Sequence, residues 1–185
     1  MTQPIKLAIV GASSTGKTTL LTHLEEYYRS NPAIAFVHES ARQFFNENQV
    51  DNPFDFENQE KILELALLNE KLVAETDPKI LITDTSVLEV MFYTKVQDNE
   101  KGYELLREKV SSYIPTYTKF LLMNPDDVVF ENDAVRREDK HTRDKIHSML
   151  IKFYHQERLP FTLISGTIPE RQKRIIDIVS SYLSL

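Results

Sequence analysis

The chain has 185 residues, a length typical of one domain, and we expect residues 1–185 to share a single core. A hydrophobic fraction of 41% excludes disordered and low-complexity classes, and the absence of cysteine excludes disulfide scaffolds, thiolate metal sites and cysteine nucleophiles. The formal net charge of −6 argues against nucleic-acid binding, and the apolar stretches are too short for a membrane span. We therefore expect a cytoplasmic protein that binds neither nucleic acid nor a membrane.

Short apolar runs alternate along the chain with longer amphipathic segments. Five runs without strict polar alternation are predicted as buried strands: Ile5–Val10, Ile34–Val37, Ile80–Thr83, Lys119–Met123 and Phe161–Ile164. Seven segments are predicted as helices: Lys17–Arg29, Ser40–Asn48, Glu57–Glu75, Ser86–Val96, Gly102–Tyr113, Thr142–Arg158 and Pro169–Tyr182. This alternation implies βαβ units, so we predict a three-layer α/β fold: a five-stranded parallel sheet with helices on both faces.

A phosphate-loop (P-loop) motif follows the first predicted strand. Gly11-Ala-Ser-Ser-Thr-Gly16-Lys17-Thr18 matches G-x-x-x-x-G-K-[ST] at every fixed position, and it uses two of the chain's only 4 glycines. Glycine lets successive backbone N–H groups curl around phosphate oxygens, and the following helix adds its dipole. Lys17 is predicted to reach the β- and γ-phosphates, and the Thr18 hydroxyl to ligate Mg²⁺. The predicted nucleotide-binding residues are Gly11, Ser13, Ser14, Thr15, Gly16, Lys17, Thr18 and Thr19.

A second Mg²⁺ ligand is expected at the tip of a neighbouring strand. Asp84 ends an apolar run and is our candidate; the alternative is that it caps the helix predicted from Ser86. Thr85 follows it, where many hydrolysing ATPases carry a water-activating Glu. The segment Thr118–Leu121 lacks the final Asp of a guanine-reading element, although the donor could still be ATP or GTP. These absences favour transfer of the γ-phosphoryl group to a bound acceptor.

An acceptor kinase needs a group that orients or deprotonates the acceptor hydroxyl. Glu39 follows the second predicted strand, at the carboxyl edge where doubly wound sheets bind ligands. Arg42 lies three residues further on, so both side chains share one helix face. We interpret Glu39 and Arg42 as acceptor-binding residues; the alternative is an ion pair on a solvated surface.

A charged segment follows the fourth predicted strand, at about residues 125–143. Kinases commonly close a lid whose arginines neutralise charge on the transferred phosphoryl group, and such a lid also excludes water. We prefer Arg136 and Arg143 over Arg137 for this role, while the interleaved acids equally fit a solvated loop. Among the aromatic residues, Phe92 and Tyr93 are candidates for stacking on a base, against the simpler interpretation that they belong to the core.

The order of these pieces resembles the ribosylnicotinamide kinase domain of the bifunctional NadR proteins and the related P-loop family of AAA-type ATPases. The matching segments are Gly11–Thr18, Glu39–Arg42, Asp84-Thr85, Asp133–Arg136 and Gly166–Arg171. The resemblance implies a nucleoside-kinase-like fold and phosphorylation of the ribose 5′-hydroxyl of nicotinamide riboside. It also implies roles for individual residues: Glu39 and Arg42 at the acceptor, Asp84 at the metal or acceptor, Arg136 in the lid, and Gly166 and Thr167 near the base with Arg171 close behind.

The chain also departs from that pattern. It has no Trp, so Tyr93 or Phe92 would have to stack on the nicotinamide ring, and Ala134 stands where the lid motif usually has Gly. Its length leaves no room for the adenylyltransferase and DNA-binding parts of the bifunctional proteins. We therefore predict a kinase that uses ATP (or GTP) and Mg²⁺ and phosphorylates nicotinamide riboside or another nucleoside. The alternative is a nucleotide-dependent regulatory module that acts through a protein partner; the sequence leaves homo-oligomerisation open.

Overall fold

The computed structural model describes residues 3–50, 52, 55–126, 128 and 140–184. The strands are β1 (Ile5–Val10), β2 (Ile34–Val37), β3 (Ile80–Asp84), β4 (Tyr117–Met123) and β5 (Phe161–Ile164). The helices are α1 (Lys17–Tyr28), α2 (Ser40–Glu47), α3 (Phe56–Ala74), α4 (Val87–Val96), α5 (Glu100–Val110), the 3₁₀ helix η1 (Ile114–Thr116), α6 (Lys140–Gln156) and α7 (Ile168–Leu183). Every predicted strand and helix is confirmed, with ends within three residues of the prediction.

The five strands form one parallel sheet in the order β2-β3-β1-β4-β5. The strand that precedes the phosphate loop, β1, therefore lies in the middle of the sheet, between β3 and β4. In the β1–β3 register Ile9 pairs with Asp84, which brings the end of β3 beside the start of the loop. A ligand bound at this carboxyl edge is thus within reach of residues from several strands.

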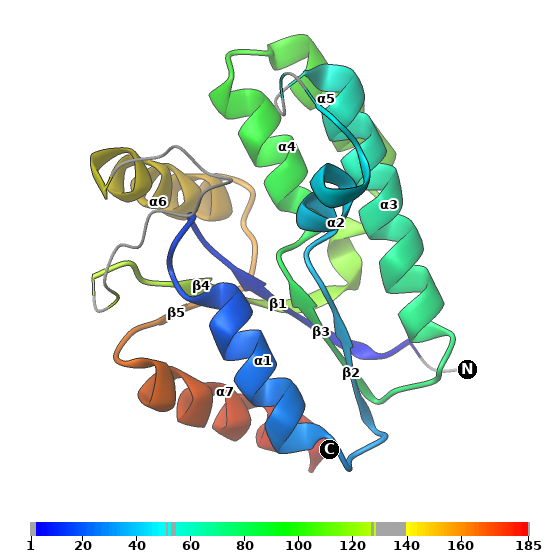
Figure 1. Cartoon of the computed structure of the whole chain (residues 1–185), viewed down its shortest axis with the longest axis vertical. Helices are drawn as coiled ribbons and strands as arrows, with labels where there is room; N and C mark the ends of the chain where they lie inside the picture. The colour runs from blue at the N-terminus through cyan, green and yellow to red at the C-terminus, as the bar shows by residue number, and fades with distance from the viewer. Residues whose placement is uncertain (1–2, 51, 53–54, 127, 129–139, 185) are drawn as a thin grey trace.

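Helices cover both faces of the sheet, as predicted (Figure 1). On one face α1 and α7 pack over a core that includes Leu7 and Ile9. On the other face residues of α3, α4, α5 and α6 pack over Ala8 and Val10. Consecutive β1 residues therefore point into two different apolar cores, and this explains why the strand shows no polar alternation.

The largest boundary difference lies between α5 and β4. The predicted helix to Tyr113 ends at Val110, and η1 follows before the sheet resumes at Tyr117. Pro115 lies in the first turn of η1, and a proline cannot donate the backbone hydrogen bond that a continuing α-helix needs. No helix of the described residues is long and apolar enough to cross a membrane.

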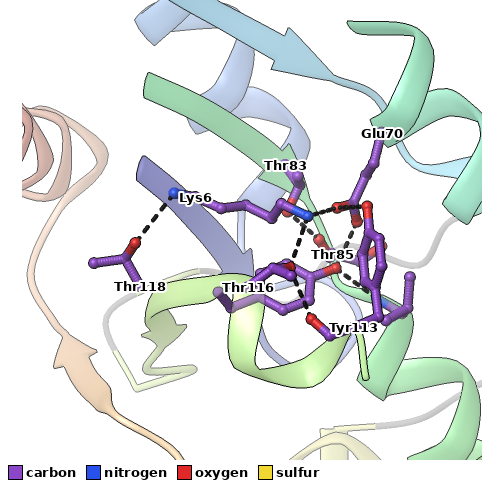
Figure 2. A network of polar contacts seen from close by, with 9 residues as sticks. Lys6, Glu70, Thr83, Thr85, Tyr113, Thr116 and Thr118 are labelled. Atoms are coloured by element: carbon purple, nitrogen blue, oxygen red, sulfur yellow. Dashed lines mark hydrogen bonds and ion pairs between the residues drawn. The ribbon is translucent and has the colours of Figure 1, made fainter. Parts of the chain in front are cut away.

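A buried polar network joins β1 to α3 and to the segment around η1 (Figure 2). The Lys6 ammonium lies 2.8 Å from the Glu70 carboxylate and donates to Thr116 Oγ1 at 3.0 Å. It also lies over the ring of Tyr113, 3.9 Å from the centroid. The two carboxylate oxygens of Glu70 accept further hydrogen bonds from Tyr113 Oη at 3.0 Å and Tyr117 Oη at 2.5 Å. The two buried charges, on Lys6 and Glu70, therefore both have several polar partners, as the burial of charge requires.

Candidate nucleotide-binding site

The phosphate loop connects β1 to α1 and has the backbone conformation that its glycines permit. Gly16 is the N-cap of α1 and has a φ of 81°, a left-handed conformation that side chains disfavour. A Cβ at Gly16 would also come within 2.8 Å of Ile168 Cδ1, so a side chain there would require the end of the Ile168 side chain to move. Ser13 and Thr15 are buried, and Thr15 Oγ1 donates to the Ala12 carbonyl at 2.8 Å. These two residues are therefore suited to binding phosphate through backbone N–H groups rather than side chains.

Lys17, the first residue of α1, folds back over the loop. Its side chain is buried, and the ammonium donates to the carbonyl oxygens of Gly11 at 2.7 Å and Ala12 at 2.9 Å. Neutral carbonyls stabilise an ammonium less than anionic oxygens do. A phosphate chain in the loop would therefore compete effectively for Lys17.

Thr18 and Asp84, the two predicted ligands of Mg²⁺, are in direct contact. Thr18 Oγ1 donates to Asp84 Oδ2 at 3.0 Å, and the Asp84 side chain is buried. Ser86, and not Asp84, is the N-cap residue of α4, so the capping alternative is not what the structure has. A hydroxyl and a carboxylate are hard oxygen donors that fit Mg²⁺, which usually takes its other ligands from water and phosphate. Among the described residues no group of three or more His, Cys, Asp or Glu side chains forms a metal site by itself.

A strained turn follows Asp84. Thr85 has a φ of 71°, which is unusual for a β-branched residue, and hydrogen bonds hold it on both sides. Its N–H donates to the Ile9 carbonyl at 2.9 Å, and its own carbonyl accepts from Thr83 Oγ1 at 2.5 Å. This turn aligns the end of β3 with β1, so that Asp84 points to the phosphate loop.

Glu39 and Arg42 lie at the start of α2, on the predicted face. Arg42 Nε lies 3.5 Å from Glu39 Oε2, and the two side chains differ in exposure: 46% for Arg42 and 8% for Glu39. The alternative of a solvated surface ion pair therefore fits Arg42, which is exposed, but not Glu39, which is buried. A small hollow lies between the ends of β2 and β3, and its lining includes Ser40, Glu70, Asp84 and Ser86. Glu39 is not itself among the lining residues, but its chain neighbours His38 and Ser40 are.

Sequence reasoning missed Glu89, a buried acid on α4. Glu89 Oε1 accepts a hydrogen bond from the Gly11 N–H at 2.8 Å, at the entrance of the loop. Burial raises the pKa of Glu89 to about 7; Lys17 and the Gly11 N–H oppose that rise, and the charges of Glu39 and Asp84 add to it. A possible signal was present in the sequence, because Glu89 is the single acid in the otherwise apolar start of α4.

The loop after β5 carries Gly166 and Thr167. Gly166 has a φ of 100°, and Thr167 is the N-cap of α7 in a capping box with Glu170. Thr167 N and Oγ1 both lie 2.8 Å from Glu170 Oε2. Behind this loop Arg171 is fully buried, and its guanidinium donates to the Gly166, Thr15 and Asn124 carbonyls. The region predicted near the base therefore contacts the phosphate loop directly.

The last three predicted site residues are Tyr93, Arg136 and Arg143, and the structure describes two of them. Tyr93 is half-buried on α4, packs against the core and makes an edge contact with Phe92, with ring centroids 5.4 Å apart. Arg136 and most of the predicted lid lie outside the described residues, so the role of Arg136 stays a prediction. Arg143 lies in the first turns of α6, with an exposed fraction of only 2%. It contacts Asp144 at 3.1 Å and the Val128 carbonyl at 3.4 Å, which favours a role in packing over contact with phosphate.

Comparison with known proteins agrees with this geometry. A family described as "AAA domain" matches residues 6–171. The chain is similar to solved structures of NadR in complex with NAD and AMP-PNP (TM-score 0.72) and with NR (TM-score 0.73), each at 20% identity. Each match covers 98% of this chain and 50% of the NadR chain, so this chain spans about half the length of those proteins. No curated protein matches it. The chain belongs to the AAA domain family and is a nucleotide-binding P-loop domain with a fold shared with NadR.

Proposed function

We propose that this domain is a kinase that transfers the γ-phosphoryl group of ATP, or of GTP, to a hydroxyl of a small nucleoside. The observation that carries the proposal is the contact of Thr18 with Asp84 directly beside Lys17, with the buried acid Glu39 at the neighbouring strand end. Phosphoryl transfer needs these parts together, since positioning and charge neutralisation supply most of the catalysis.

In the proposed reaction the acceptor hydroxyl oxygen attacks the γ-phosphorus. The bond from that phosphorus to the β–γ bridging oxygen breaks, ADP leaves, and the hydroxyl proton passes to Glu39 or Asp84. Lys17 exchanges its carbonyl partners for phosphate oxygens, and Thr18 and Asp84 hold Mg²⁺, which neutralises phosphate charge when bound. Arg136 is proposed to approach the transferred group from the lid.

Nicotinamide riboside is the acceptor that we propose first. NadR, with which the chain shares its fold, has been solved with NR and with AMP-PNP. Glu39 and Arg42 together offer an acceptor of hydrogen bonds and a donor of hydrogen bonds, which suits the hydroxyl groups of a ribose. Tyr93 is proposed as the aromatic contact of the base.

Phosphorylation of a nucleoside panel, including nicotinamide riboside, tests this function. We expect acceptor-dependent ADP release, with the phosphorylated product identified by mass spectrometry, and no activity in Lys17→Met. In Glu39→Gln we expect a loss of transfer of about 10²-fold with nucleotide affinity retained, because only the contact with the acceptor changes. Equal losses of transfer and of nucleotide binding would assign Glu39 a structural role. ADP release that no nucleoside raises above the acceptor-free rate would contradict the kinase.

A nucleotide-dependent regulatory module is the second candidate. Thr85 is compatible with this function as well as with a kinase, because it stands where many hydrolysing ATPases have their water-activating Glu and so allows slow turnover of a bound nucleotide. Affinity capture with protein loaded with a non-hydrolysable nucleotide, compared with nucleotide-free protein, tests this function. A partner retained in the first sample alone would favour it, and identical captures would count against it.

A further inference from the structure

One buried guanidinium joins three segments around the nucleotide site. Arg171 lies in the first turn of α7 and has an exposed fraction of 0%. Its Nε donates to the Gly166 carbonyl at 2.6 Å, its Nη2 to the Asn124 carbonyl at 2.6 Å and its Nη1 to the Thr15 carbonyl at 3.1 Å. These carbonyls belong to the loop after β5, the end of β4 and the phosphate loop.

The bond to Thr15 determines where the next N–H points. A trans peptide is planar, and its C=O and N–H point in opposite directions. When Arg171 holds the Thr15 oxygen from behind the loop, the N–H of Gly16 must face away from Arg171. Gly16 starts α1, and N–H groups at the start of a helix are the ones that bind phosphate.

A second contact from α7 reinforces this arrangement. Ile168 packs so closely against Gly16 that a Cβ there would lie 2.8 Å from the Ile168 side chain. The start of α7 therefore supports the peptide from Thr15 to Gly16 through a guanidinium and an apolar side chain. Only arginine can hold three carbonyls at once in this way, since its planar group carries donors on all three nitrogens, whereas the lysine ammonium is a single point.

We propose that Arg171 is a positioning residue that holds the Gly16 N–H toward the phosphate chain and joins the loop after β5 to the phosphate loop. The nucleotide then binds a cradle that is already formed. Preorganisation of this kind increases affinity because less conformational freedom is lost on binding. The proposal rests on nucleotide binding by the loop but not on the identity of the acceptor.

Binding of two probes to the full chain tests the proposal: MgATP, and tripolyphosphate with Mg²⁺, which has no base. In Arg171→Met we expect both affinities to fall about tenfold or more, because the loss of a charge-assisted hydrogen bond loosens the cradle itself. Arg171→Lys keeps the positive charge but loses the planar guanidinium with its donors on three nitrogens, so we expect most of the loss of affinity to persist. Arg174→Met is the matched control, one turn further along α7 and exposed, and should bind as the unaltered chain does.

Four results would overturn the proposal. These are unchanged tripolyphosphate affinity in Arg171→Met, full recovery in Arg171→Lys, an equal loss in Arg174→Met, and failure of both Arg171 variants to fold, which would assign the residue to folding. Affinities are measured at low temperature, where circular dichroism verifies that each variant is folded, so that a lower melting temperature alone does not imitate the expected result. An unaltered chain that binds neither probe would instead contradict the proposed function.

Discussion

Two buried lysines, Lys6 and Lys17, stand at opposite ends of the segment formed by β1 and the phosphate loop, and their surroundings differ in kind. Their exposed fractions are nearly equal, at 5% and 6%. Lys6 is enclosed by a carboxylate, a hydroxyl and two aromatic rings. Lys17 donates to two backbone carbonyls at the edge where ligands bind. Burial therefore does not distinguish a structural lysine from a functional one, whereas the partners do: the partners of Lys6 compensate its charge permanently, and those of Lys17 can be exchanged for phosphate.

The acceptor edge depends indirectly on the Lys6 network. Tyr117 Oη donates to Glu70 and accepts from the Val87 N–H, the first residue of α4, at 3.2 Å. Val87 lies just after the turn that follows Asp84, so the network holds the start of α4 next to that turn.

Lys6→Met is expected to have the largest effect. It leaves the Glu70 carboxylate buried without its cation, so the free energy of unfolding should fall by about 3–5 kcal/mol, while the folded fraction binds nucleotide normally. Urea unfolding measures the loss, and Lys173→Met on the exposed side of α7 is the control. Adding Glu70→Gln to Lys6→Met should recover part of the stability. Equal stability in Lys6→Met and Lys173→Met would contradict the structural role of Lys6.

The Glu89 carboxyl, beside Lys17, should make stability depend on pH. Its pKa is raised from 4.5 to about 7, so the folded state keeps a proton that the unfolded state has lost between these values. The free energy of unfolding therefore falls as pH rises through that window, by at most about 3 kcal/mol, and stays reduced above it.

Glu89→Gln should remove this dependence, because its amide oxygen can still accept from the Gly11 N–H without carrying a charge. Relative to the unaltered chain the variant should gain stability at about pH 8 and none at about pH 4. Urea unfolding in the absence of nucleotide and Mg²⁺ measures both, since Lys17, Glu39 and Asp84 are then the charges acting on Glu89. A difference that stays constant with pH would show that the Glu89 pKa is not raised.

Lys17→Met should weaken nucleotide binding more than stability, which is the opposite of what we expect for Lys6→Met. We expect MgATP affinity to fall about 10²-fold, through loss of the charge on the β- and γ-phosphates, with much less effect on stability in the absence of nucleotide. Titration calorimetry and urea unfolding on the same preparation separate the two. Unchanged affinity, or destabilisation as large as that of Lys6→Met, would place Lys17 in the structural class.

Thr18→Val is expected to have the smallest of these effects. It removes the hydroxyl that lies 3.0 Å from Asp84, so the Mg²⁺-dependent part of ATP affinity should fall about tenfold. Thr19→Val, at the adjacent exposed position, keeps its backbone N–H and should bind normally. If both variants responded alike to Mg²⁺, the hydroxyl of Thr18 would not be a metal ligand.

The sequence alone determined the elements and the phosphate loop. Strand and helix periodicity is local, and the loop requires glycine at particular backbone conformations, as at Gly16. The position of Asp84 was also predictable, because parallel strands end at the same edge of the sheet. The contacts of Lys6, Glu89 and Arg171 were not predictable, because their partners lie far away in the sequence.

The tertiary structure alone decided which charged side chains are sealed in and which remain available to a ligand. An isolated lysine or glutamate in an apolar segment carries no local signal of its partner, and its role depends on what other elements place beside it. The fold gives Lys6 a carboxylate, gives Lys17 two carbonyls at the carboxyl edge of the sheet, and gives Arg171 three carbonyls from separate segments. The charge of a buried group must be compensated, and the choice of compensating partner determines whether a ligand can replace it.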